Sequence, residues 1–186
     1  LDTTAGERER GSLEPLLTNP AAPLALVIGK WGAVAAVSML IALLSVLSFL
    51  PAQWLIRGET LRSLFLFGPR EALGFLLVLL PLAASLSAAM MAVAIRCRSF
   101  KEAQANSTVV ILAVSLLPLL TLFNQGGEKP WFVWLPALAQ HTLMNRVLRG
   151  DSLSATDLLA PLAVALLLTA LCLGYIARRL RAAAVR

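Results

Sequence analysis

The chain has 186 residues, of which 59% are hydrophobic and 14% are charged, and its formal net charge is +6. An ordinary soluble domain has roughly 25% charged residues, so this chain has too little polar surface to cover its core in water. Its excess apolar surface must face something other than water, and a lipid bilayer is the simplest candidate. Because the basic residues lie at the edges of apolar runs and not in one patch, their placement argues against nucleic-acid binding.

The first segment, residues 5–20, is charged and too polar to span a bilayer. Ser12 can cap a short helix that ends at Asn19-Pro20. Mixed charge beside an apolar ridge suits a docking surface for a soluble partner, whereas a solvated loop beside the membrane explains the charge pattern alone more simply. The sequence starts at Leu1 and not at Met, just ahead of this charged segment, so we expect a C-terminal fragment of a longer protein.

Four apolar stretches are long enough to cross a bilayer: residues 24–50, 72–95, 103–123 and 158–177. Each holds about 20 residues or more, which covers a hydrocarbon core of roughly 30 Å at 1.5 Å per residue. The first is uncharged from Trp31 onward, and the third begins with several polar residues, so its start is the least sharply defined. The sequence predicts an all-α, polytopic membrane helix bundle that forms a single transmembrane domain over residues 1–186.

Prolines and small residues inside the spans predict how the helices pack. Pro81 and Pro118 should kink their helices, which membrane proteins tolerate where neighbours satisfy the freed carbonyls. Pro161 is expected in the first turn of the last helix, where proline costs little. The second span contains a stripe of small residues at four-residue spacing: Ala84, Ala88 and Ala92. Such a stripe lets another helix approach closely, or it arises by chance in an alanine-rich segment.

Basic residues near the span ends predict the orientation. The N-terminal segment, the turn around residues 96–104 and the tail after residue 177 share one side if there are four spans, and they carry ten Lys and Arg against six on the other side. Because cytoplasmic loops carry the excess of basic residues, both ends of the chain are expected in the cytoplasm.

Residues 125–150 form the most distinctive connection. A turn is followed by an aromatic cluster that we expect at the level of the lipid headgroups. From Pro136 onward the pattern places apolar side chains on one helical face and polar ones, including Gln140 and Arg146, on the other. The segment is too polar to span, so it predicts an external element that is re-entrant or lies in the interface, or a plain interfacial loop. Its candidate residues are Trp131, Trp134, Pro136, Gln140 and Arg146.

Several kinds of chemistry have no motif in the sequence. There is no GxxxxGK[ST], so the chain should not bind ATP through a P-loop. The one histidine, His141, argues against a His-ligated metal site, and GxSxG is absent. No acid lies deep within a span, so no embedded carboxylate relay is visible. Cys97 and Cys172 fit no ligand spacing and are interpreted as small buried hydrophobes.

Three segments carry a family resemblance. The first has an acidic–basic run, a short helix, a proline and a span that opens near Gly-Lys; its matching residues are Arg10, Gly11, Leu13, Glu14, Pro20, Gly29 and Lys30. Residues 99–104 and 135–140 add to the match. The chain thereby resembles, over nearly its whole length, the permease subunits of ABC-2 type exporters, and most of all the NatB-type sodium-efflux branch.

The resemblance implies that residues 7–17 form a cytoplasmic coupling helix that docks on a separate ABC ATPase subunit, through Glu7, Arg8, Glu9, Arg10, Gly11 and Glu14. It also implies a re-entrant element over residues 131–149. The family normally has six spans and works with paired halves, so a second permease copy or paralogue and two earlier spans are expected. ATP and Mg would bind the partner subunit, so this chain is expected to bind no cofactor and to be no enzyme.

The leading interpretation is a membrane-spanning permease subunit of an ATP-driven exporter in the plasma (inner) membrane. Sodium export is suggested by the resemblance alone, and drugs, lipids or peptides remain open as substrates. One alternative is a membrane anchor or assembly protein without transport activity. Another is an intramembrane protease, which needs paired Glu and His residues within spans; the sequence supplies neither.

Overall fold

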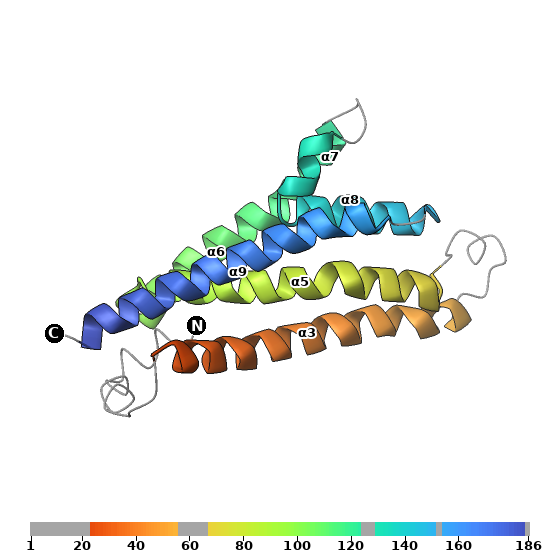
Figure 1. The fold of residues 1–186 in the computed structure, drawn as a ribbon. Helices are drawn as coiled ribbons and strands as arrows, with labels where there is room; N and C mark the ends of the chain where they lie inside the picture. The colour runs from red at the N-terminus through yellow and green to blue at the C-terminus, as the bar shows by residue number, and fades with distance from the viewer. Residues whose placement is uncertain (1–22, 56–66, 124–128, 152–153, 185–186) are drawn as a thin grey trace.

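The computed structural model describes residues 23–55, 67–123, 129–151 and 154–184 (Figure 1). The charged segment over residues 5–20 lies outside these ranges. Within them the regular elements are helical: α3 (Pro23–Leu55), α5 (Pro69–Ala94), α6 (Phe100–Leu116), η2 (Leu117–Leu119), α7 (Leu120–Phe123), η3 (Pro130–Trp134), α8 (Leu138–Leu148) and α9 (Ala155–Ala184).

Four of these helical segments are long and apolar enough to cross a membrane: Leu24–Pro51, Pro69–Ala94, Phe100–Leu119 and Ala155–Ala182. Between 11% and 28% of the apolar window of each is buried inside the chain. The remaining apolar surface faces outward, which water would disfavour and lipid accepts. The predicted all-α membrane bundle with four spans is therefore confirmed.

Helix α5 is the centre of the bundle and contacts α3, α6, α8 and α9. Figure 1 shows α3, α5 and α9 running side by side, while α6 diverges from them. One apolar cluster joins α3, α5 and α9 near one end: Val27, Met91, Ile176, Ala177 and Leu180. A second cluster joins α3, α5 and α8 near the other end: Val46, Phe67, Ala72, Phe75 and Val147.

Small residues let α3 approach α5 closely. The indole Nε1 of Trp31 donates to the Ala84 carbonyl of α5 at 3.0 Å, and Ser87 Oγ donates to Ser38 Oγ at 3.2 Å. Ala88, one turn beyond Ala84, is fully buried. Hydrogen bonds to backbone and hydroxyl groups across a helix pair need close approach, which small side chains on one stripe allow.

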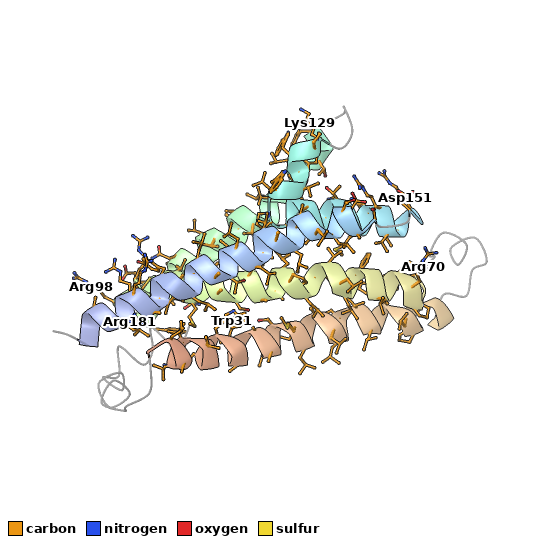
Figure 2. The ribbon with its side chains drawn as sticks, in the orientation of Figure 1. Trp31, Arg70, Arg98, Lys129, Asp151 and Arg181 are labelled. Carbon is orange, nitrogen blue, oxygen red and sulfur yellow. The ribbon has the colours of Figure 1, made fainter. Side chains whose placement is uncertain are left out.

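The two ends of the bundle differ in charge. We call one the basic end; it carries Arg96, Arg98, Lys101, Arg178, Arg179 and Arg181. Figure 2 shows Arg98 and Arg181 at this end, and Arg70 and Asp151 at the opposite end. The basic end also holds an acid, Glu102, whereas the opposite end combines several cations and acids, among them Arg70, Glu71, Arg149 and Asp151. Charge bias of this kind is the basis of membrane orientation.

The three prolines act differently. At Pro118 the third span changes from α-helix to the 3₁₀ turn η2, and α7 then points away from the bundle (Figure 1). Pro81 stays within the continuous helix α5. The expectation for Pro161 was wrong: because α9 begins at Ala155, this proline lies in the second helical turn, where it removes a backbone hydrogen bond to Asp157.

Candidate functional site

Of the two predicted sets of site residues, the structure describes one. The docking residues Glu7, Arg8, Glu9, Arg10, Gly11 and Glu14 lie outside the described ranges, so their role stays a prediction. The other set lies on η3, on α8 and, for Pro136, on the turn between them; η3 packs against α9, and α8 packs against α5 and α9. The site is therefore built from four elements: η3, α8 and the parts of α5 and α9 that they contact.

The aromatic segment η3 leads the chain back to the bundle. Phe132 is buried, and its ring meets that of Trp131 edge-on at a centroid distance of 4.6 Å. Trp131 and Trp134 are exposed, with 46% and 65% of their surface accessible. Phe132 thus anchors η3 while the two indoles face outward, and their placement at headgroup level stays a prediction.

The start of α8 is an unusual backbone turn closed by a buried side chain. Ala137 has φ 68° and ψ −42°, a region that costs a residue with a Cβ of order 1–3 kcal/mol. Its backbone N–H donates to Gln140 Oε1 at 2.7 Å. The first N–H groups of a helix have no partner within the helix, and at this buried position water does not replace one. The Gln140 side chain therefore holds the turn closed.

Burial of Gln140 corrects the sequence interpretation. The amphipathic pattern placed this residue on the polar face, but only 3% of its surface is accessible. The buried face of α8 comprises Leu138, Ala139, Gln140, Thr142, Leu143 and Val147. Thr142 satisfies its hydroxyl within the helix, donating to the Leu138 carbonyl at 2.9 Å. Gln140 is buried because its amide oxygen accepts a hydrogen bond from the backbone N–H of Ala137. Helical periodicity alone does not reveal that this N–H lacks another acceptor.

Helix α8 runs alongside the first half of α5. Its start lies near Pro81, because Gln140 and Pro81 line one cavity. Its end lies at Gly74, where an added Cβ would stand 3.1 Å from a methyl group of Val147. Seven residues separate Gly74 from Pro81, about 10 Å along a helix. The chain thus enters the bundle part-way along its length and returns toward the opposite end.

An ion pair joins the end of α8 to the start of α9. Arg146 Nη1 lies 3.4 Å from Asp157 Oδ1, and Asp157 Oδ2 accepts the Ser154 N–H at 3.2 Å. The carboxylate therefore has two roles: it caps the first turn of α9 and it pairs with α8. The amphipathic pattern of residues 136–149 singles out Arg146, but nothing in the sequence indicates Asp157 as its partner.

Asp157→Ala is expected to lower the free energy of unfolding by about 1–2 kcal/mol, since it removes both the cap and the ion pair. Asp157→Asn keeps an acceptor for the cap and should cost less than about 1 kcal/mol, because both charged side chains are about a third exposed. Thermal unfolding of the detergent-solubilised protein measures both. Arg149→Gln, at an exposed position, is the control; equal losses for the two Asp157 variants would show that the cap contributes nothing.

Two cavities lie between α5, α8 and α9. The inner cavity has a volume of about 330 Å³ and is lined by Leu77, Val78, Leu80, Pro81, Gln140, Leu143, Leu158, Pro161 and Leu162. The outer cavity, toward the opposite end, has a volume of about 250 Å³ and is lined by Arg70, Glu71, Leu73, Gly74, Leu77, Val147, Gly150, Asp151 and Leu158. In the ranges described, no three His, Cys, Asp or Glu side chains converge as metal ligands.

Two residues that position α8, Gly74 and Ala137, were not among the predicted site residues. Gly74 gives α8 its close approach to α5, and an isolated glycine in an apolar helix is a recognised signal for such approach. Ala137 carries the turn that brings the chain back. Its conformation had no sequence signal, because positive φ favours glycine or asparagine and not alanine.

Comparison with known proteins places the chain in a family. The model of the family described as "ABC-2 family transporter protein" matches residues 1–182. A curated relative, the ABC transporter permease protein NatB of Bacillus subtilis (strain 168), is 29% identical over 156 residues. That alignment covers 81% of this chain and 40% of the relative, so the chain spans less than half of the relative's length. No solved structure matches.

The family match includes the charged segment over residues 5–20 as well as the four spans and α8. It confirms the resemblance that the matching residues around Arg10-Gly11 and Gly29-Lys30 indicated. With four spans and this match, the chain is a multi-pass membrane protein, and it belongs to the ABC-2 family of transporter proteins.

Proposed function

We propose that the chain is part of a permease subunit of an ATP-driven exporter, and that this subunit works with a separate ATPase subunit. The observation that carries this proposal is the family match over residues 1–182, supported by the similarity to the NatB permease protein. The match covers the charged segment together with the bundle, which supports treating them as one functional unit. Sodium as the cargo rests on the resemblance to the sodium-efflux branch.

The charge distribution supports a location in the plasma (inner) membrane in which the basic end of the bundle faces the cytoplasm. Both ends of this chain, and the coupling segment over residues 5–20, would then face the ATPase. Helix α8 and the mixed charges of the opposite end would face outside. ATP binding in the partner would move the coupling segment, and the spans would switch between inward-facing and outward-facing states.

A second permease copy or paralogue is supported by the surface of the third span. Large apolar residues of α6, η2 and α7 are exposed: Val109, Ile111, Leu112, Leu116, Leu119, Leu120 and Phe123. The inner cavity of the single chain is almost wholly apolar, with Gln140 as the one polar side chain among the described residues that line it. Ions require polar ligands along their path, so a route between two copies suits an ion better than this cavity does.

Charge reversal in the coupling segment tests the proposal. In the full-length protein reconstituted with its ATPase, Glu9→Lys combined with Arg10→Glu should reduce sodium flux roughly tenfold or more, because reversed charges at an interface cost several kcal/mol. The ATPase should lose its stimulation by the permease. Glu9→Asp with Arg10→Lys keeps both charges and serves as the control.

Two results would contradict the proposal. Normal flux in the reversed variant would show that these residues do not dock the ATPase. If no ATPase co-purifies with the full-length protein in stoichiometric amount, a membrane anchor or assembly protein without transport activity is the better assignment.

A further inference from the structure

We infer that the two cavities form one binding groove for a single amine-bearing phospholipid, with an acyl chain in the inner cavity and the headgroup in the outer one. The groove is formed by α5, α8 and α9, and lipid binding there does not depend on the proposed transport function. No comparison assigns a ligand to this groove.

The two cavities are continuous. Leu77 of α5 and Leu158 of α9 line both of them. Leu77 is 53% exposed and Leu162, at the inner cavity, is 40% exposed, so the groove is open along its side. A molecule in the surrounding bilayer can therefore enter from the side without passing through the bundle.

The length of the groove matches one leaflet. Arg70 lies at the start of the span that begins at Pro69, where lipid headgroups are expected. Pro81, at the inner end, lies eleven residues further along α5, about 16 Å at 1.5 Å per residue. A hydrocarbon core is roughly 30 Å thick, so the groove runs from the membrane edge to about the bilayer centre.

The inner cavity suits hydrocarbon and little else. Its volume of about 330 Å³ falls at the lower end of the roughly 300–1,000 Å³ typical of ligand sites. Its lining is leucine, valine and proline except for Gln140, whose amide oxygen already accepts the Ala137 N–H. Water needs two to four polar partners, and an empty cavity forfeits the dispersion contacts of its lining. An acyl chain supplies those contacts.

Among the described residues that line it, the outer cavity has one cation and two acids, which fit a zwitterionic headgroup. Arg70 can bind a phosphate, and Glu71 and Asp151 can bind an ammonium group. Neither the Arg70 guanidinium nor the Asp151 carboxylate makes an ion pair within the described part of the chain, whereas Glu71 Oε2 accepts the Gly68 N–H at 2.8 Å. A purely anionic headgroup would satisfy Arg70 but would face two carboxylates, so phosphatidylethanolamine is favoured over phosphatidylglycerol.

Native mass spectrometry tests the inference on the full-length protein, delipidated and then incubated in detergent with equimolar phosphatidylethanolamine and phosphatidylglycerol. We expect one phosphatidylethanolamine per chain to be retained about tenfold over phosphatidylglycerol. Leu77→Trp, which fills the junction of the two cavities, should reduce retention about tenfold. Leu166→Trp, at a 62% exposed position of α9 outside both cavities, is the matched control and should leave retention unchanged.

The headgroup is tested separately. Asp151→Asn should reduce the preference for phosphatidylethanolamine severalfold while a lipid is still retained, and Arg70→Gln should weaken retention of both lipids. Equal retention in Leu77→Trp and Leu166→Trp, or a preference for phosphatidylglycerol in the unmodified protein, would overturn the inference. If Leu77→Trp does not elute as a single species, Leu162→Trp fills the inner cavity from the other wall and decides the question.

Discussion

Replacing Gly74 by leucine is expected to push α8 away from α5 and to lower the free energy of unfolding by roughly 1–3 kcal/mol. A Cβ at this position would stand 3.1 and 3.2 Å from the two methyl groups of Val147. Valine is stiff at χ1, so those methyl groups cannot rotate away. The larger leucine must displace the end of α8 itself, and thermal unfolding of the detergent-solubilised protein measures the loss.

A second substitution identifies the cause. Val147→Ala removes the methyl groups that leucine meets, so the double variant should be more stable than the sum of the two single changes by at least about 0.5 kcal/mol. Gly174→Leu on α9 is the matched control, because an added Cβ there meets no atom within 4 Å. If Gly74→Leu and Gly174→Leu behave alike, or if Val147→Ala gives no recovery, the close contact is not what fixes α8.

Replacing Gln140 by methionine is expected to cost about 1–3 kcal/mol, because the buried Ala137 N–H loses its acceptor while the side-chain volume is nearly kept. In a surrounding as apolar as the inner cavity, the cost should lie toward the upper end of that range. The same unfolding measurement applies. Gln104→Met on α6 is the control, since Gln104 is exposed and its side chain makes no hydrogen bond within the described ranges.

A glycine in place of Ala137 is expected to stabilise the protein, whereas the change at Gln140 destabilises it. Ala137→Gly removes the Cβ from a backbone with φ 68°, so it should raise the free energy of unfolding by about 1 kcal/mol. Ala137→Val places a β-branched side chain there and should lower it. Were Gln140→Met neutral, or were glycine at residue 137 destabilising, the hydrogen-bonded turn would not be what holds the start of α8.

The spans were predictable because a bilayer requires a long continuous run of apolar residues, and such a run can be recognised from the sequence alone. A continuous apolar run of about 20 residues has few alternatives to crossing the membrane, and all four predicted runs coincide with helical segments of the structure, although the run over residues 72–95 ends one residue beyond α5. The ends were harder to predict. Helix α9 begins at Ala155, ahead of its apolar run, because Ser154 and Asp157 cap it. Pro161 therefore lies in the second turn of this helix and not in the first.

The candidate site was only partly predictable, for a different reason. The segment containing Trp131, Pro136 and Arg146 stands out by its aromatic and amphipathic pattern, but the burial of Gln140 depends on one backbone turn at Ala137. A pattern with a helical period assigns polar residues to the surface, and it contains no information about a donor that needs an acceptor three residues away. The lining of the groove likewise comes from three helices, of which α5 is distant in sequence from α8 and α9.

The shortness of α8 has a consequence for how the protein is made. Eleven residues reach about 16 Å, half of the roughly 30 Å that an inserted segment must cover. Helix α8 is therefore too short for the insertion machinery to release it into the membrane as a spanning helix. This helix must reach its place after α5 is already in the bilayer, and Arg146 and Asp157 tie it to α9, the last helix described. Biogenesis of this region is thus completed by folding within the membrane, and a change in α9 can leave α8 unplaced without altering the number of times the chain crosses.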